Sequence, residues 1–432
     1  MRNPAEGRTW VRSMLIGIVL VTATRSFAAQ GPHQGEHWVS SWATAQQLTP
    51  VVNPSWAKPP PKVREEHSPI LPIPERIENQ TVRMLIRTTI GGKQVRVQLS
   101  NAQGYDPVAI GSVHVALHGQ GSGIVAGSDR TATFGGQARV ELQPGAVIVS
   151  DPIDLAVPQL STLAISLYVP EKVAQLTVHP LGLHTTYLAP GDLTSATSLA
   201  HARECNSYFW LTGVAVLAPG DTQAIAALGD SITDGYATTP NAEHAWPSVL
   251  FERSMARRPG GNRSVVNLGI SGNRVLHDGS GTSALARFDR DILSRPGVRW
   301  IIFLEGINDI SFPAIPGAPA GDHISAEDLI AGYRKLIEKA HLHGIKIVAG
   351  TILPWEGVWT YTPQGEAIRQ RVNRWIRSSK AFDDTIDFDA VTRDPAHPTR
   401  LNPEFDSGDH VHPNDAGNRA MAEAIDLSFF DD

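Results

Sequence analysis

Five short apolar runs alternate with helical patterns over the second half of the chain, and this alternation limits the fold more than any other feature. Strands that alternate with helices form a parallel sheet, because each helix carries the chain back to the start of the next strand through a right-handed crossover. The pattern therefore predicts a parallel sheet of five strands in an α/β domain over residues 219–432. The five predicted strands lie at residues 225–228, 265–268, 301–304, 345–349 and 386–388.

Two of the helices between these strands carry end signals in the sequence. Ser325, followed three residues later by Asp328, is a capping pair at a helix start, and Gly344 is a typical helix stop. Thr362 and Pro363 open a second helix, since proline is tolerated in the first helical turn.

Residues 81–218 carry a different pattern, in which apolar and polar residues alternate with a period of two. The alternation begins at Val82, breaks at Gly91-Gly92 and resumes at Val95, as expected for strands joined by turns. Many short strands with Gly and Pro turns, and no helix of normal length, predict an all-β sandwich or jelly-roll-like domain. A chain of 432 residues is also too long for one ordinary core, which supports two domains.

The segment at residues 30–80 is predicted to be irregular, because its prolines exclude regular helix and central strand. Trp38, Trp42 and Trp56 suggest that this segment is pinned to a surface. Trp38 and Trp42 are interpreted either as core packing or as platforms for sugar rings. The prolines are Pro50, Pro54, Pro59, Pro60, Pro61, Pro69, Pro72 and Pro74.

Residues 1–29 are interpreted as a secretory signal peptide. A basic start precedes an apolar run at 14–24, and the small residues of 26–29 offer a cleavage site. The apolar run is too short to span a bilayer, and no later run has the required length. The prediction is a secreted or periplasmic protein without stable membrane insertion after signal removal, although Arg25 also allows an uncleaved anchor.

Charge and cysteine content exclude some classes of function. The chain has 37 Lys and Arg against 43 Asp and Glu, for a net charge of −6, and no basic cluster stands out. Nucleic acid is therefore not an expected partner. Cys205 is the only cysteine, so no intrachain disulfide can form, and this lone cysteine is interpreted as a buried apolar residue.

Polar segments directly follow the first three predicted strands. Residues 229–235 read Gly-Asp-Ser-Ile-Thr-Asp-Gly, where Gly229 permits a tight turn and Ser231 is a candidate nucleophile. Residues 267–273 and 306–309 follow the second and third strands. The carboxyl ends of parallel strands meet at one edge of the sheet, where ligands bind in open α/β sheets. We therefore expect the three segments to form one site at this edge.

Together with Asp-His-Val-His-Pro at 409–413, these segments resemble the SGNH hydrolases, also called the GDSL family of esterases and lipases. The Ser, Gly, Asn and Asp-x-x-His blocks occur in order and cover about the last half of the chain. Asn-Leu-Gly-Ile-Ser-Gly-Asn-Arg and Leu-Glu-Gly-Ile-Asn-Asp-Ile are similar to a subgroup of secreted arylesterases and acylhydrolases linked to polysaccharide degradation. The resemblance implies a three-layer α/β/α, flavodoxin-like catalytic domain and ester hydrolysis without a cofactor.

The catalytic hypothesis begins with Ser231, because a serine hydroxyl needs a base to act as a nucleophile. His412 is the candidate base, and Asp409 is close enough in a turn to accept its Nδ1–H. His410 is the nearest rival, but the family pattern places the base directly before a proline, as His412 precedes Pro413. Taken alone, the Asp-x-x-His spacing also fits an Asp409 that merely caps the last helix.

The resemblance assigns three donors to the oxyanion of a tetrahedral intermediate, namely the Ser231 N–H, the Gly272 N–H and the Asn308 side-chain amide. A glycine lets the backbone approach a ligand closely, and an amide donates without carrying a charge. Gly269 is the alternative to Gly272. A simple turn at Gly272 and a loop-stapling amide at Asn308 are the non-catalytic interpretations.

Other polar residues near these segments have structural interpretations. Asp230, Asp234 and Asp309 are expected to accept backbone N–H groups and so to staple the loops. The His and Asp residues at 406–412 are dense enough to suggest a metal, but no carboxylate-rich strand end supports a two-metal phosphoesterase. The prediction is a site without metal and without cofactor.

The loops at the catalytic edge are expected to select the substrate. Residues 310–324 form a long loop rich in Pro and Gly directly after the third polar segment. Trp355 and Trp359 follow the fourth strand and offer aromatic faces for a sugar ring or an aryl ester, or else pack between domains. Arg274, beside the oxyanion segment, is a candidate substrate-binding residue, or it pairs with Asp278.

The sequence thus predicts a secreted serine ester hydrolase that removes short acyl groups, above all acetyl, from a small-molecule or polysaccharide ester. A lipase or lysophospholipase is the alternative within the enzyme class. A non-catalytic glycan-binding protein is the alternative outside it, against which the intact Ser231, Asn308, Asp409 and His412 argue. The oligomeric state and the role of the all-β domain do not follow from the sequence.

Overall fold

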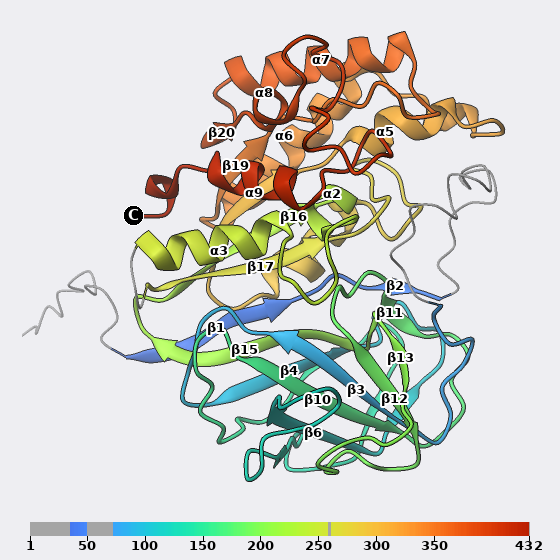
Figure 1. Ribbon diagram of the computed structural model, residues 1–432, viewed down its shortest axis with the longest axis vertical. Helices are drawn as coiled ribbons and strands as arrows, with labels where there is room; N and C mark the ends of the chain where they lie inside the picture. Colours follow the sequence, from blue (N-terminus) through green and yellow to red (C-terminus); the bar gives the residue numbers. More distant parts are fainter. Residues whose placement is uncertain (1–34, 50–71, 258–260, 432) are drawn as a thin grey trace, which may run out of the picture. The chain divides into compact units, whose positions relative to one another are not determined.

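The computed structural model shows a β region followed by an α/β region and describes residues 35–49, 72–257 and 261–431 (Figure 1). Both regions belong to one compact unit, Gln34–Asp432. The predicted signal peptide at 1–29, Trp56 and all of the prolines before residue 72 lie outside the described residues. No helix in the described part of the chain has the length and apolar character needed to cross a bilayer.

The α/β region is built on a sheet of five parallel strands, as the five apolar runs predict. Their spatial order is β17-β16-β18-β19-β20, which is the flavodoxin-like order. Folds of this kind bind ligands where the strand order reverses, here beside the carboxyl ends of β16 and β18. The strands are β16 (Gln223–Gly229), β17 (Arg263–Gly269), β18 (Val298–Leu304), β19 (Lys346–Gly350) and β20 (Asp384–Ile386).

The register of this sheet aligns the ends of three neighbouring strands, β17, β16 and β18. Gly229 lies opposite Gly269 on one side and opposite Leu304 on the other. The loops that follow β16, β17 and β18 therefore leave the sheet at the same level. This alignment brings the three polar segments of the sequence to one edge.

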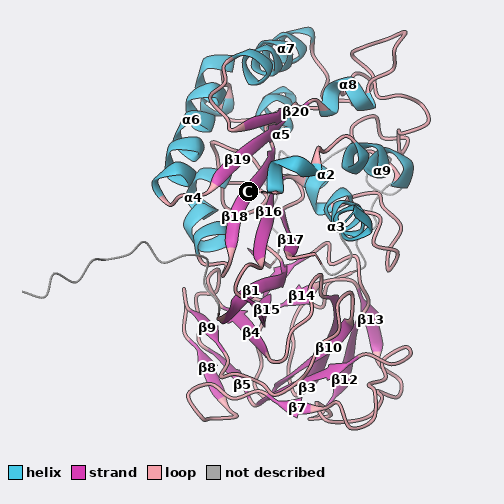
Figure 2. Ribbon diagram, turned by 90° about the vertical axis from the view of Figure 1, so that its left-hand side faces the viewer, coloured by secondary structure: helices cyan, strands magenta, loops and turns pink. Residues whose placement is uncertain are grey.

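Helices cover both faces of the sheet and complete the predicted three layers (Figure 2). α4 and α6 lie on one face, and α3 and α9 lie on the other. The helices are α2 (Ser231–Asp234), α3 (Trp246–Arg257), α4 (Ala284–Phe288), α5 (Ile307–Ser311), α6 (Ala326–Leu342), α7 (Pro363–Ser378), α8 (Phe388–Thr392) and α9 (Asp415–Glu423). A π-helical turn (Asp289–Leu293) continues α4, and 3-10 turns occupy Phe312–Ala314, Ala320–Asp322 and Leu427–Phe430.

The predicted helix ends are confirmed. Ser325 and Asp328 form a reciprocal capping box at the start of α6, and Gly344 follows the helix with a positive φ of 66°. The Thr362 hydroxyl accepts the Gly365 N–H at the start of α7, where Pro363 occupies the first helical position. Local capping chemistry therefore fixes these two helices at the places the sequence indicates.

The β region consists of antiparallel sheets, as predicted for residues 81–218. The larger sheets have the orders β13-β12-β3-β10-β6-β7 and β1-β15-β4-β9, with smaller sheets β14-β11-β2 and β5-β8. No helix occurs among the described residues that precede α2. The strands are β1 (Glu36–Ala43), β2 (Gln47–Leu48), β3 (Gln80–Arg87), β4 (Val95–Ser100), β5 (Val108–Ile110), β6 (Ser112–Leu117), β7 (Arg130–Thr131), β8 (Val140–Leu142), β9 (Val147–Val149), β10 (Thr162–Val169), β11 (Thr177–His179), β12 (Thr186–Pro190), β13 (Arg203–Cys205), β14 (Tyr208–Phe209) and β15 (Leu211–Pro219).

One expectation for residues 30–80 is wrong, because the start of this segment is not irregular. Strand β1 pairs antiparallel with β15 along its whole length. The prolines that exclude regular structure begin only at Pro50, so the backbone N–H groups of β1 are free to join a ladder. Trp42 packs edge-on against Tyr208, with ring centroids 4.9 Å apart, and is half-buried, which agrees with the packing interpretation.

The β region touches the α/β region along β1 and β17. The Ser264 hydroxyl of β17 donates to the Ser40 carbonyl of β1 at 2.6 Å, and the Ser40 N–H donates to the Pro296 carbonyl at 2.9 Å. The contact between the regions therefore includes polar pairs that are shielded from water.

Cys205 is fully buried and unpaired, as expected for an apolar role.

Leu329→Ala should lower the free energy of unfolding by about 2–5 kcal/mol, because truncation of a core leucine leaves a cavity. Leu329 is 0% exposed in α6. Ile330, the next residue of the same helix, is only half-buried, so Ile330→Ala is a matched control with a smaller expected loss. Urea unfolding of both variants measures the difference, and equal losses would contradict this orientation of α6.

Candidate active site

Ser231 lies directly beyond the carboxyl end of β16, at the first position of α2. Gly229 ends the strand, and a Cβ on it would lie 2.4 Å from the Leu304 carbonyl oxygen, so no larger residue fits. Asp230 caps α2 by accepting the Ile232 N–H at 3.0 Å. Ser231 is 6% exposed, so its hydroxyl sits in a largely dehydrated position.

His412 is bonded to both Ser231 and Asp409. Its Nε2 lies 2.7 Å from the Ser231 Oγ, and its Nδ1 lies 2.5 Å from Oδ2 of Asp409. The other carboxylate oxygen, Oδ1, accepts the backbone N–H groups of Val411 at 3.1 Å and His412 at 2.9 Å. The carboxylate holds the ring with Nε2 toward the hydroxyl, which is the geometry needed to remove the serine proton.

The charge state of Asp409 suits this role. Burial alone would raise the pKa of Asp409, but the charge and hydrogen bond of His412 and two backbone N–H bonds hold it well below its usual range. The carboxylate is therefore ionised and can stabilise a protonated His412 ring. Tyr236 packs against that ring with centroids 4.3 Å apart, which restricts its movement.

His410, the rival base, lies in a different arrangement. Its Nδ1 is 2.6 Å from Oδ2 of Asp406, and its side chain is 49% exposed. Its backbone has a positive φ of 69°, a conformation that histidine adopts more readily than most residues. His412 and not His410 is the histidine bonded to Ser231.

Gly272 and Asn308 lie in the loops that follow the two neighbours of β16. Gly272 has a positive φ of 79°, and a Cβ there would lie 2.6 Å from the Ser280 hydroxyl oxygen. Asn308 is the second residue of α5, and its amide donates one hydrogen bond to the Asn273 carbonyl at 2.9 Å. An amide carries two N–H donors, so one remains for a ligand. Gly269 instead packs tightly against the Asp234 backbone.

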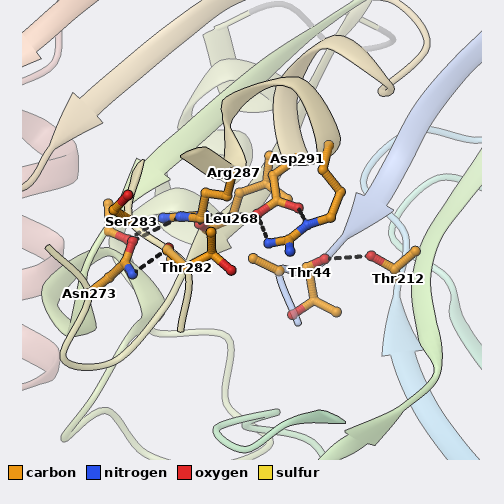
Figure 3. Close-up of polar contacts among 12 residues, drawn as sticks. Thr44, Thr212, Leu268, Asn273, Thr282, Ser283, Arg287 and Asp291 are labelled. Carbon is orange, nitrogen blue, oxygen red and sulfur yellow. Dashed lines mark hydrogen bonds and ion pairs between the residues drawn. The ribbon is translucent and has the colours of Figure 1, made fainter. Parts of the chain in front are cut away.

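The buried Arg287 of α4 bonds to the ends of β16 and β17 and to the loop that carries Gly272, a role that the sequence does not reveal (Figure 3). Its guanidinium donates to the Leu268 carbonyl at 2.7 Å, to the Gly229 carbonyl at 2.9 Å and to the Asn273 side-chain oxygen at 2.9 Å. Asp291 accepts a fourth bond at 3.3 Å. The only signal in the sequence is that Arg287 is a charged residue on the side of α4 that packs against the rest of the protein.

The carboxylates near Ser231 staple the loops, as expected. Asp309 accepts the Val275 N–H at 2.8 Å and the Leu276 N–H at 3.0 Å. Burial raises the pKa of Asp230 to about 7 and that of Asp309 to about 6. At a pH of about 5 these two acids are therefore mostly protonated, whereas Asp409 is ionised.

Two of the three predicted substrate residues have other partners. Trp355 is 0% exposed, and its Nε1 donates to Glu366 at 3.1 Å, so the expectation of a substrate platform is wrong for this residue. The Arg274 side chain is 3% exposed and pairs with Asp322 at 2.8 Å, which ties it to the 310–324 loop. Trp359 is 39% exposed, so part of the residue is open to solvent.

The sequence could not foresee the burial of Trp355, because the residues after β19 carry no periodic pattern. The Asp278 pairing expected for Arg274 exists only through the Asp278 backbone carbonyl. Among the residues that the structure describes, no three His, Cys, Asp or Glu side chains are grouped to hold a metal ion.

Comparison with protein families identifies the α/β region. Residues 227–420 match the model of the GDSL-like lipase/acylhydrolase family. This part of the chain belongs to that family, and the protein is a carboxylic ester hydrolase of the SGNH superfamily. A search of curated proteins finds no match to the chain.

Solved structures similar to part of the chain include three hydrolases. An acetylxylan esterase from Geobacillus stearothermophilus has 24% identity and a TM-score of 0.37, and the match covers 47% of this chain and 91% of that protein. A GDSL-like lipase from Bacteroides thetaiotaomicron has 19% identity and a TM-score of 0.35, over 49% and 89%. An α/β hydrolase from the metagenome of Lake Arreo has 20% identity and a TM-score of 0.36, over 47% and 92%. The family assignment rests on the family model.

Asp230→Asn should reduce the loss of stability that accompanies a rise in pH. The folded protein holds the Asp230 proton up to a pH of about 7, whereas an unfolded chain releases it near the ordinary pKa of about 3.9. Between these values the folded state binds more protons than the unfolded state, so stability falls as pH rises. Asparagine has no such proton to lose.

The measurement is urea unfolding of wild type and variant at a pH of about 5 and a pH of about 8. We expect the free energy of unfolding to fall less in Asp230→Asn than in wild type between the two conditions. Asp328→Asn is the control, because the hydrogen bonds from Ser325 lower the pKa of Asp328 and it titrates only at lower pH. An identical pH slope in wild type and Asp230→Asn would show that Asp230 is not buried as a neutral acid.

Proposed function

We propose that the protein is a secreted or periplasmic serine esterase in which Ser231, His412 and Asp409 form the catalytic triad. The observation that carries the proposal is the unbroken hydrogen-bonded line from the Ser231 Oγ through the His412 ring to the Asp409 carboxylate. His412 takes the proton as Ser231 attacks the ester carbonyl, and it then gives that proton to the departing alcohol. Water hydrolyses the acyl-enzyme by the same route in reverse, without metal or cofactor.

The oxyanion of each tetrahedral intermediate accepts bonds from the Ser231 N–H, the Gly272 N–H and the Asn308 amide in this proposal. The three groups belong to the loops after β16, β17 and β18, whose ends are aligned in the sheet. Fixed donors of this kind need no reorganisation when the negative charge develops. The Asn273 carbonyl supports the arrangement because it orients the Asn308 amide.

The proposed substrates are small-molecule or polysaccharide esters with short acyl groups, above all acetyl groups on carbohydrate. Trp359 supports this choice, because it is a tryptophan that is 39% exposed, and exposed aromatic rings suit contact with a sugar ring. The signal peptide expected at residues 1–29 supports a location where such polymers occur. The resemblance of the strand-end motifs to polysaccharide-linked acylhydrolases points in the same direction.

Ser231→Ala and His412→Asn should each lower the turnover of p-nitrophenyl acetate by about 10⁶-fold, because the nucleophile or its base is lost. His410→Asn is the matched control, since His410 lies two residues from His412, carries its own aspartate partner and is not bonded to Ser231. Wild type is assayed in parallel with p-nitrophenyl octanoate and with acetylated polysaccharide.

Faster hydrolysis of octanoate than of acetate would replace the acetyl esterase by a lipase-type acylhydrolase. Equal rates for wild type and Ser231→Ala would remove the catalytic proposal altogether and favour a glycan-binding protein. Loss of activity in His410→Asn, with activity kept in His412→Asn, would show that His410 and not His412 is the base.

Asn308→Ala should lower kcat by about 10²–10³-fold with a small effect on KM, because the lost donor acts on charge that develops in the transition state. Asn308→Asp tests the same donor with little change of shape and places a carboxylate where negative charge develops. Steady-state kinetics on p-nitrophenyl acetate measure both variants. A kcat close to that of wild type in both would exclude Asn308 from the oxyanion site and leave it the loop-stapling role.

A further inference from the structure

A buried histidine of the β region reaches the turn that follows the nucleophile. His179 is the last residue of β11, and its Nε2 lies 2.9 Å from Oδ1 of Asp234. Asp234 is the last residue of α2, three positions after Ser231. Both side chains are 4% exposed. The bond therefore joins the two regions in a place where water does not compete for it.

The hydrogen-bond partners of His179 define its charge. Its Nδ1 lies 2.7 Å from the Ala45 carbonyl oxygen, and its Nε2 lies 2.9 Å from the Leu181 carbonyl oxygen in addition to Asp234. Carbonyl oxygens only accept, so both ring nitrogens must carry a hydrogen and the ring is an imidazolium. Burial alone would lower the pKa of His179, but the Asp234 charge and the three acceptors raise it above its ordinary value.

The second oxygen of Asp234 holds the loop that carries Gly272. Oδ2 accepts the Ser271 N–H at 3.0 Å and the Ser271 hydroxyl at 2.8 Å. Gly269 allows this close approach, since a Cβ there would lie 2.3 Å from the Asp234 nitrogen. The bonds thus run without interruption from His179 through Asp234 to the residue directly before Gly272.

We propose that His179 is a positioning residue of the esterase, which holds Asp234 so that Asp234 fixes the Ser271-Gly272 segment of the oxyanion site. The inference rests on the proposed function, because it assumes that the Gly272 N–H meets the oxyanion. Without the imidazolium, Asp234 is a buried carboxylate that lacks its counter-charge, and such groups move or take up a proton. Either change loosens the Ser271 contacts, and small misplacements of catalytic groups are costly.

The test compares two amide substitutions of His179 in the full chain. His179→Asn keeps a donor near the Nδ1 position and loses the donor to Asp234, whereas His179→Gln places an amide N–H near the Nε2 position. We expect kcat for p-nitrophenyl acetate to fall by about 10²-fold in His179→Asn at nearly unchanged KM. His179→Gln should recover a large part of this loss, because it restores the bond to Asp234.

Ser264→Ala is the control for the contact between the regions. Ser264 lies near the start of β17, at the opposite end of the strand from the Gly272 loop, and bonds to Ser40 and Thr89 of the β region. This variant should lower the thermal unfolding temperature and leave kcat unchanged. Thermal unfolding of all variants separates a loss of stability from a loss of positioning.

The outcomes distinguish the inference from the function on which it rests. Wild-type kcat in His179→Asn, whatever its unfolding temperature, would overturn the positioning role while leaving the esterase intact. Equal rates in wild type and Ser231→Ala would overturn the esterase and the inference together. If His179→Asn does not fold, Asp234→Asn takes its place, and it must lower kcat at nearly unchanged KM for the inference to stand.

Discussion

The sheet edge that carries the candidate active site depends on one buried guanidinium, that of Arg287. It holds the carbonyl oxygens of Gly229 and Leu268, which lie at the ends of adjacent strands, and the side chain of Asn273. Burial of a charge costs several kcal/mol. Hydrogen bonds to a charged group contribute about 1.5–3 kcal/mol each, so three of them together with Asp291 can offset that cost. The polar loops above Arg287 are thereby fixed relative to one another before any substrate arrives.

The environment shifts the pKa values of the buried acids in this part of the molecule in opposite directions. Glu305 lies 3.7 Å from Arg287, its carboxyl oxygens have no hydrogen-bond partner, and burial raises its pKa well above the ordinary value. Asp230, directly before Ser231, also has a raised pKa. Asp409 receives backbone N–H bonds and faces His412, so its pKa is lowered and it stays ionised. Burial without hydrogen bonds thus favours the protonated carboxyl group, whereas hydrogen bonds and a facing histidine favour the carboxylate that orients the His412 ring.

Sequence patterns predict the parts of this site that depend on local chemistry. Ser231, with its flanking glycines, follows a strand-like apolar run, and His412 precedes a proline within three residues of its carboxylate. Gly229 lies 58 residues from Arg287, and Asp234 lies 55 residues from His179, so no local pattern marks these two contacts. The substrate-binding role predicted for Trp355 is wrong for a related reason, because the sequence of an irregular loop does not indicate whether an aromatic side chain is buried or exposed. The sequence does not predict strand β1, because the prolines from Pro50 onward make the whole 30–80 segment resemble irregular structure.

Long-range hydrogen bonds also join the β region to the α/β region across the boundary at residue 219. The sequence pattern changes at residue 219, but a buried charged side chain on each side of this residue bonds to a residue on the other side. Arg295 donates to the Thr44 carbonyl at 3.3 Å and to the Thr212 hydroxyl at 2.9 Å, and its Nε donates to the Asp291 carbonyl at 3.2 Å. His179 reaches from the other side to Asp234. An isolated α/β region would leave the side chain of Arg295 without these two acceptors and Asp234 without its counter-charge. Residue 219 thus marks a change of secondary structure inside the compact unit Gln34–Asp432, in which side chains of the β region bond to the loops of the candidate active site.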